Sequence, residues 1–388
     1  MGVIAFAIEM GSGFGHIKRC LPIARAAADL GHRPLFLVTN PSESASVLAR
    51  EGIEVRSAPG RWQGRARSGR VATSYADIMG DAGFADIALL REVTADWDIL
   101  LEQLRPLAVV SELSPFLNLA IHGAGIPLLV VGYGFALPPP HLATFPRLRS
   151  GVPFFDEPSL LNNVTAICRQ RGRAAPRGLP SLFEGQAHAV TGLEALDPYS
   201  EQRRDRAVGP PALEASLTRG EPKEQVFAYL LGDAPATLDI LRALASSGVH
   251  GQAFVRRGTT AHREAVARSR IAYLEHPAPI KGALERAALI VHHGSMLTSE
   301  EALVAGRPQL VVPLYLEHLF TARALASLGI ARVVRPPPTP DGIASVLASA
   351  LQDASMSNRA FTIAETFWRT SPPPADLPMQ LLRRVIPA

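Results

Sequence analysis

The sequence predicts an α/β protein with two domains, in each of which helices cover both faces of a parallel sheet. The length of 388 residues corresponds to about two domains of roughly 100–200 residues each. Short apolar runs alternate with segments of helical period, an order that is typical of parallel sheets. The same order begins again at Gln225, which indicates a second domain of the same class.

The first half of the chain supplies the strands and helices of the first predicted domain. We expect strands at 3–8, 34–39, around Val55, 107–110 and 127–131. We expect helices at 21–30, 45–50 and 85–104, and one more helix that ends near Gly125. Short, almost wholly apolar strands are typical of a sheet that is buried on both faces. Residues 138–224 are rich in Pro, Gly and Arg, and they predict long surface loops followed by an interdomain connection near 213–222.

The second half repeats this pattern. We expect strands at 225–231, 252–255, 271–274, 289–292 and 310–312, with helices ending near Ser247 and Ala305. Residues 361–368 and 379–386 predict two final helices on either side of the sequence SPPPAD.

Composition excludes several classes of protein. Cys20 and Cys168 are too few for a disulfide framework, which favours a reducing compartment. The first ten residues lack a basic leader and contain Glu9, so they predict a buried strand and not a signal peptide. Since no run of about 20 apolar residues occurs, we expect a cytoplasmic protein with no transmembrane segment.

Basic residues are mostly arginine, and several arginines gather in two loop segments. Only three of the 39 Lys and Arg residues are lysines, and with a net charge of +4 no nucleic-acid partner is expected. A basic loop that contains an aromatic residue can recruit an anionic acceptor, although the sequence favours simple solvated loops. The two segments contain Arg56, Arg61, Arg65, Arg67 and Arg70 around Trp62, and Arg169, Arg171, Arg173 and Arg177.

A glycine-rich segment, GSGFGHIKR at 11–19, follows the first predicted strand. A dinucleotide fingerprint would need Gly in place of His16 and an acid where Thr39 and Asn40 stand, so a dehydrogenase is excluded. His16 instead follows the carboxyl end of a parallel strand, where such sheets bind ligands. We expect its neutral imidazole to act as a general base toward a hydroxyl, with simple helix capping as the alternative.

Glu112 comes directly after the strand expected at 107–110, again at a carboxyl end. If this strand lies near the first one, Glu112 can fix the tautomer of His16 and stabilise the imidazolium. A solvated or helix-capping acid beside Ser111 and Ser114 is the alternative.

The second notable segment is ALIVHHGSMLTSEEALVAGRP at 288–308. A strand ends at His292, the chain turns, and a helix follows that Gly306 stops. Imidazoles, hydroxyls and unpaired amides at a helix start can hold a diphosphate without a metal.

Together the two segments resemble the GT-B glycosyltransferases, in particular the superfamily of UDP-glycosyltransferases and macrolide glycosyltransferases. Residues 11–32 are similar to the N-terminal signature of that superfamily, and residues 292–331 to its donor-binding signature. The resemblance implies two Rossmann-like domains whose sheets face each other across a cleft. It implies an acceptor domain at 1–215, a donor domain at 216–360, and a helical tail at 361–388 that packs back on the first domain.

The resemblance also implies an activity and a set of partners. The expected enzyme is an inverting, metal-independent hexosyltransferase that moves a sugar from a UDP or dTDP sugar to a hydroxyl of a small-molecule or lipid acceptor. The arginine-rich segments would favour an acceptor that carries a negative charge. No cofactor is implied. A nucleotide-sugar epimerase and a non-catalytic nucleotide-sugar-binding protein remain as alternatives.

Site residues follow from the resemblance position by position. His16 matches the catalytic base and Glu112 its acidic partner, with Ser111 as the competitor for that role. The acceptor-side turn would contain Gly13, Phe14 and Gly15. The donor diphosphate would bind Gly232, His292, His293, Gly294, Ser295, Met296 and Thr298, the ribose and sugar Glu300, Glu317 and His318, and the nucleobase Tyr273, His276, Pro277 and Ile280.

Some positions depart from the family pattern. Arg19 stands where a proline is frequent, and the loop reads HHGSMLT where many bacterial members have HHGGAGT. The nucleobase loop lacks its usual Trp. The acidic pair Asp96 and Asp98, of a type that holds metal in another glycosyltransferase fold, is expected on the solvent face of a helix.

Overall fold

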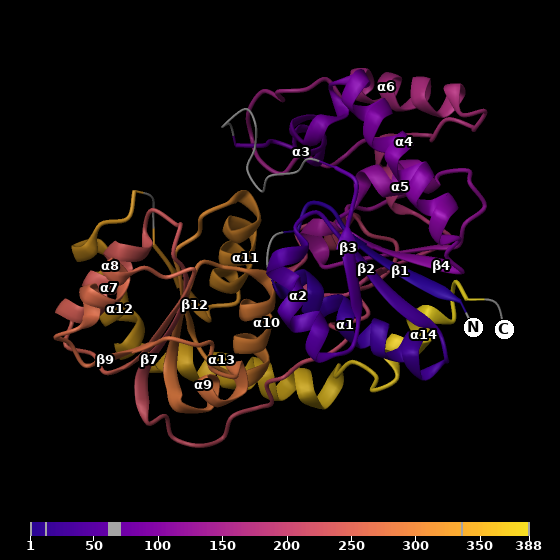
Figure 1. Ribbon diagram of the computed structural model, residues 1–388. Coiled ribbons are helices and arrows are strands. Elements are labelled where there is room, and N and C mark those ends of the chain that lie inside the picture. The colour runs from indigo at the N-terminus through magenta and orange to yellow at the C-terminus, as the bar shows by residue number, and fades with distance from the viewer. Residues whose placement is uncertain (1, 12–13, 61–70, 335–336, 387–388) are drawn as a thin grey trace. The chain divides into compact units, whose positions relative to one another are not determined.

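The computed structural model describes residues 2–11, 14–60, 71–334 and 337–386 (Figure 1). The chain divides into two compact units: unit 1 is Met1–Ala212 with Pro373–Ala388, and unit 2 is Leu213–Pro372. The first unit thus ends at Ala212, three residues before the boundary at 215/216 that the resemblance implies.

Unit 1 is built on a six-stranded parallel sheet with the order β3-β2-β1-β4-β5-β6. Its strands are β1 (Val3–Ile8), β2 (Arg33–Val38), β3 (Glu54–Ser57), β4 (Ala108–Glu112), β5 (Leu128–Gly132) and β6 (Ala187–Val190). Its α-helices are α1 (Phe14–Asp29), α2 (Pro41–Arg50), α3 (Tyr75–Met79), α4 (Ile87–Leu104), α5 (Pro115–Ile121), α6 (Glu157–Gln170) and α14 (Leu377–Leu382). β1 lies between β2 and β4, so its carboxyl end is at the middle of the sheet edge.

Unit 2 repeats this design with the order β12-β11-β10-β7-β8-β9, again parallel throughout. Its strands are β7 (Glu224–Leu231), β8 (Gly251–Arg256), β9 (Ile271–Leu274), β10 (Ala287–His292), β11 (Gln309–Val311) and β12 (Ala331–Val333). Its helices are α7 (Thr237–Ser246), α8 (Thr260–Val266), α9 (Ile280–Arg286), α10 (Met296–Ala305), α11 (Leu316–Ser327), α12 (Pro340–Gln352) and α13 (Ala354–Thr370). The predicted fold, two parallel Rossmann-like sheets with their helices, is confirmed.

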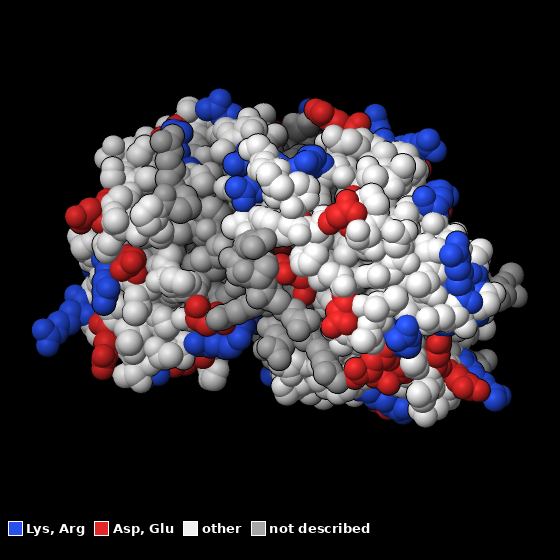
Figure 2. All heavy atoms as spheres, turned by 90° about the horizontal axis from the view of Figure 1, so that it is seen from above, with Lys and Arg blue, Asp and Glu red and all other residues white. Residues whose placement is uncertain are grey.

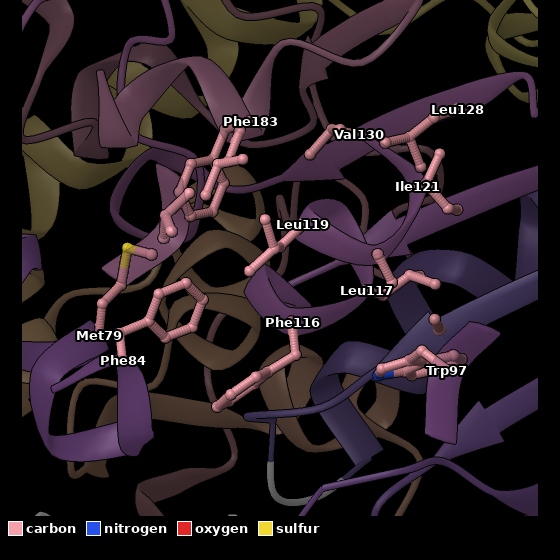
Figure 3. Packing of buried hydrophobic residues seen from close by; sticks show 14 of the residues in the cluster. Met79, Phe84, Trp97, Phe116, Leu117, Leu119, Ile121, Leu128, Val130 and Phe183 are labelled. Atoms are coloured by element: carbon pink, nitrogen blue, oxygen red, sulfur yellow. The ribbon is translucent and has the colours of Figure 1, made fainter. Parts of the chain in front are cut away.

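Both faces of the unit 1 sheet are buried. Along β1, Ala5 and Ala7 belong to one apolar cluster, whereas Ile4, Phe6 and Ile8 belong to another. Successive side chains of a strand point to opposite faces, so two separate cores flank the sheet. Figure 3 shows the first of these cores, to which Trp97 from α4, Leu117 from α5, and Leu128 and Val130 from β5 contribute.

The region 138–224, expected to be mainly loops, contains an α-helix and a β-strand of unit 1. Helix α6 begins after Asp156, whose carboxylate accepts a hydrogen bond from the backbone N–H of Ser159. Strand β6 has only four residues, of which two are alanines, so its apolar signal is weak. Helix α1 also begins earlier than expected, at Phe14, and therefore includes His16.

The predicted C-terminal tail is divided between the two units. Helix α13 packs on α10 in unit 2, where Ala360 and Ala364 are buried and the indole N–H of Trp368 donates to the carbonyl of Val304 at 2.8 Å. Only α14 packs on α1 in unit 1. Residues 361–370 thus stay with unit 2, where Ala364 packs on α10 and Trp368 is hydrogen-bonded to it. Among the described residues, no helix combines the length and the apolar character needed to cross a bilayer.

Candidate active site

The side chains of His16 and Glu112 meet at the carboxyl edge of the unit 1 sheet. In the register of the parallel pair β1 and β4, Ile8 lies opposite Glu112, and α1 then brings His16 back over that edge. Nδ1 of His16 lies 2.8 Å and 3.0 Å from the two carboxylate oxygens of Glu112. Glu112 is fully buried, whereas the side chain of His16 is 16% exposed.

This geometry selects one tautomer of the neutral imidazole. A carboxylate only accepts hydrogen bonds, so Nδ1 of His16 carries the proton that it donates to Glu112. Nε2 then carries the lone pair. A buried carboxylate on Nδ1 both orients the ring and stabilises the imidazolium that forms when Nε2 takes a proton.

Ser111, which the sequence also allowed as the partner of His16, does not take that role in the structure. Its hydroxyl donates to the amide oxygen of Asn118 on α5 at 2.6 Å. Neighbouring residues of a strand point to opposite faces, so Ser111 faces α5 where Glu112 faces His16. The acidic residue is therefore the one in contact with the histidine.

Three residues around His16 were not expected from the sequence. A Cβ atom on Gly11 would lie 2.6 Å from Cδ2 and Cγ of His16, so only glycine leaves room for the ring. The ring centroid of Tyr133, just after β5, lies 6.1 Å from that of His16. The guanidinium of Arg19 lies over the Tyr133 ring at 5.2 Å and donates to the carbonyl of Thr191.

The predicted acceptor-side turn is only partly described. Gly13 lies outside the described residues, while Phe14 and Gly15 form the first residues of α1. Of the three expected residues, Phe14 and Gly15 can be placed relative to His16, because they precede it in α1. The sequence signal that could have identified Gly11 is its position as the first glycine after β1, five residues before His16.

In unit 2, β10 delivers His292 to the carboxyl edge of its sheet. Nε2 of His292 lies 2.9 Å from the amide oxygen of Gln309 on β11, and Nδ1 accepts a hydrogen bond from the N–H of Gly294 at 3.0 Å. The residue is 1% exposed, and burial lowers its pKa to about 4. Its side chain is neutral and holds the turn at Gly294 from within.

Two further buried histidines lie beside it. Nδ1 of His293 lies 3.1 Å from the carbonyl of Val312, and burial lowers the pKa of His293 to about 4. The pKa of His318, on α11, is lowered to about 3, mainly by burial and to a lesser extent by the other two histidines. Nδ1 of His318 is buried without a hydrogen-bond partner among the described residues. The cluster is therefore uncharged at neutral pH.

The start of α10 carries the remaining diphosphate candidates. Gly294 adopts φ 93°, which turns the chain from β10 into the helix. The hydroxyl of Ser295 donates to that of Thr298 at 3.0 Å, and the side chain of Met296 is buried. The first amides of a helix have no partner within it, so this turn offers N–H groups and hydroxyls to an anion.

The two glutamates in α10 have different surroundings. Glu301 accepts hydrogen bonds from the N–H groups of Glu214 and Ala215 at 3.0 and 2.7 Å, so it anchors the first residues of unit 2. Glu300 is fully buried on the same helix. Glu317 is half-buried in the first turn of α11, next to His318.

The nucleobase candidates lie at the far edge of the same sheet. Tyr273 is on β9 and half-buried, with the guanidinium of Arg263 6.0 Å from its ring centroid. His276 and Pro277 are exposed after the strand, and Ile280 begins α9. Near the end of β7, a Cβ on Gly232 would lie 2.2 Å from the carbonyl oxygen of Arg257, so this turn requires glycine.

One of the two arginine-rich segments has a structural role in unit 1. Arg171 donates to Asp98 and to the carbonyls of Leu119 and Ala120, and Arg173 donates to Ala120, so these arginines bind the end of α5. Residues 61–70, which include Arg61, Trp62, Arg65, Arg67 and Arg70, lie outside the described residues. Over the face seen in Figure 2, basic and acidic side chains are interspersed. No group of three metal-ligating side chains occurs among the residues that the structure describes.

Comparison with known proteins gives short sequence matches. No protein-family model matches the chain. The O-mycaminosyltylonolide 6-deoxyallosyltransferase of Streptomyces fradiae is 35% identical over 86 residues, which are 21% of this chain and 20% of that protein. Glycosyltransferase GtfC of Amycolatopsis orientalis is 38% identical over 82 residues, again 21% of this chain and 20% of that protein. The matched segments thus span about a fifth of each relative.

Solved structures match over the whole length. The calicheamicin glycosyltransferase CalG4 gives a TM-score of 0.73 at 20% identity, covering 100% of this chain and 99% of that chain. Glycosyltransferase VinC in complex with dTDP gives 0.68 at 18% identity, covering 98% and 99%. The chain therefore has the GT-B fold, and both the relatives that it matches in sequence and the structures that it resembles are named glycosyltransferases.

Proposed function

We propose that the chain is an inverting, metal-independent glycosyltransferase that transfers a sugar from a UDP or dTDP sugar to a hydroxyl of a small-molecule or lipid acceptor. The observation that carries the proposal is the buried carboxylate of Glu112 on Nδ1 of His16. That pair suits proton removal from an acceptor hydroxyl. The GT-B fold and the named glycosyltransferases among its relatives support the reaction class.

The proposed reaction is a single displacement at the anomeric carbon. Nε2 of His16 takes the hydroxyl proton while the acceptor oxygen forms its bond to that carbon. The bond from the anomeric carbon to the diphosphate oxygen breaks on the opposite face, and the diphosphate leaves with the electron pair. Glu112 stabilises the imidazolium throughout, and one displacement inverts the configuration.

The donor diphosphate would bind at the start of α10. The hydroxyls of Ser295 and Thr298 and the first amides of the helix supply donors for its charge without a metal ion. His292 would act by holding Gly294 in the turn, because both of its nitrogens are bonded within unit 2. The negative charge that develops on the departing diphosphate would therefore be stabilised by hydrogen bonds from these hydroxyls and amides.

The test is the His16→Ala variant, assayed with a panel of UDP and dTDP sugars and candidate acceptors. We expect unchanged donor affinity and lost transfer. Equal transfer by wild type and variant would refute the role of His16. Incubation of wild type with donor alone separates an epimerase, which converts the sugar without acceptor, and a donor that binds but never reacts would indicate a non-catalytic binding protein.

A further inference from the structure

Glu9 is a buried acid that the proposed reaction does not use. It follows β1 directly, is 2% exposed, and burial raises its pKa to about 8 although three N–H donors lower it. A carboxyl group is rarely buried so completely unless it is paired or hydrogen-bonded. Its partners therefore indicate what it holds in place.

The carboxyl group of Glu9 joins two helices of unit 1. Its Oε1 accepts from the indole N–H of Trp97 on α4 at 2.6 Å and from the N–H of Leu117 at 2.9 Å. Its Oε2 accepts from the N–H of Phe116 at 2.9 Å. Both oxygens are thus occupied, and the first turn of α5 is tied to the end of β1.

The backbone around Glu9 holds the segment between Glu112 and α5. The N–H of Glu9 donates to Oγ of Ser114 at 3.0 Å, and that hydroxyl donates to the carbonyl of Glu112 at 3.0 Å. The N–H of Met10 donates to the carbonyl of Leu113 at 3.1 Å. Each residue from Glu112 to Ser114 is therefore bonded directly or through one hydroxyl to residues 9 and 10.

This segment contains a strained residue. Leu113 has φ 50°, a left-handed conformation that is unfavourable for a residue with a side chain. Such a conformation persists only where the surrounding contacts determine it. Leu113 is also the residue directly after Glu112, so its conformation sets the direction of the chain where it leaves β4.

We propose that Glu9 is a positioning residue, whose carboxyl group clamps the turn after β4 and thereby holds Glu112 on Nδ1 of His16. The inference rests on the proposed function only in giving that histidine its catalytic role. The contact of Glu112 with His16 spans 96 positions of sequence; β4, which carries Glu112, pairs with β1, and α1, which carries His16, follows β1 in the chain. The clamp joins them through the end of that same strand.

The variant Glu9→Gln tests this with little change in volume. The variants are compared above pH 8, where Glu9 is ionised and both of its oxygens accept hydrogen bonds. In the variant the amide oxygen can replace Oε1, but the amide nitrogen then meets the N–H of Phe116, donor against donor. Glu157→Gln is the matched control, because Glu157 also accepts from a backbone N–H, that of Phe145 at 3.0 Å, and burial raises its pKa to about 7. Glu157 lies on α6, away from the turn.

The first readout is the imidazole ¹⁵N signals of His16, which report the nitrogen that carries the proton. In wild type we expect a protonated Nδ1 and an unprotonated Nε2. In Glu9→Gln we expect signals shifted toward a mixture of tautomers, with kcat reduced on the order of 10-fold and the dissociation constant of the donor unchanged. Glu157→Gln should match wild type in all three measurements.

A folded Glu9→Gln variant with wild-type ¹⁵N signals would overturn the proposal. If that variant does not fold, Trp97→Phe takes its place, since it withdraws one of the three donors and keeps an aromatic ring; a smaller shift in the same direction is expected, and unchanged signals overturn the proposal. A wild type that transfers no sugar would refute the proposed function, while the ¹⁵N signals would still test Glu9.

Discussion

Replacing Glu112 by Gln removes the charge from the partner of His16 and keeps the shape of the side chain. The amide oxygen can still accept from Nδ1, so the loss is the attraction between carboxylate and imidazolium. At a charge separation of roughly 4 Å and an effective dielectric constant of about 20, that attraction is at most about 4 kcal/mol. The difference between a charge-assisted and a neutral hydrogen bond sets a lower value of about 1 kcal/mol.

These values predict a fall in kcat between about 5-fold and about 1000-fold for Glu112→Gln. Donor affinity should stay at the wild-type value, since the candidate donor residues belong to unit 2 and Glu112 to unit 1. The assay is release of nucleoside diphosphate at saturating donor and acceptor, together with donor binding by calorimetry. A kcat within twofold of wild type in a folded variant would refute the pairing of His16 with Glu112 as the catalytic base.

Three other perturbations test separate parts of the proposed site. Gly11→Ala places a Cβ 2.6 Å from the His16 ring, so we expect a loss of kcat on the order of 10–100-fold with little change in melting temperature, and an unaltered kcat would contradict this close approach. Gly294→Ala should lower the free energy of unfolding of unit 2 by about 1–3 kcal/mol in urea titrations, because φ is 93° and the new Cβ lies 3.0 Å from the carbonyl of His318. Metal removal with EDTA should leave transfer rates unchanged, whereas a rate restored only by a divalent cation would refute metal independence.

Sequence patterns predicted the fold better than they predicted the surroundings of the site. Apolar strands and helical periods recur strongly enough to indicate two parallel sheets. The short strands β6 and β12, whose apolar patterns are weaker, were not predicted, and neither were several helices, among them α6, α8, α11 and α12. The pairing of His16 with Glu112 could be anticipated because both follow strand ends, given that β4 lies next to β1. The roles of Tyr133 and Glu9 could not, since they depend on contacts between elements far apart in the sequence, whereas Gly11 could have been identified as the first glycine after β1.

Buried acids and buried histidines are distributed unequally between the two units, and this predicts opposite responses to pH. In unit 1, burial raises the pKa of Glu9 to about 8 and that of Glu157 to about 7, from 4.5. Between pH 4.5 and 8 the folded unit then binds more protons than the unfolded chain. The contribution of these two acids to the free energy of unfolding is therefore complete below pH 4.5 and falls as pH rises through that window; His122 and His141, whose pKa burial lowers, oppose it below pH 6.5.

In unit 2 the sign is reversed. Burial lowers the pKa of His292 and His293 to about 4 and that of His318 to about 3, from 6.5. The unfolded chain binds more protons below pH 6.5, so the free energy of unfolding of unit 2 falls as pH drops from 6.5 toward 4, partly offset by Glu301, whose pKa burial raises. Urea titrations read by hydrogen exchange of peptides from β4 and β10 should show unit 2 weakened at pH 5 and unit 1 weakened at pH 8. Parallel pH profiles in the two units would contradict the assignment, and His318→Gln should flatten the acid limb of unit 2 alone.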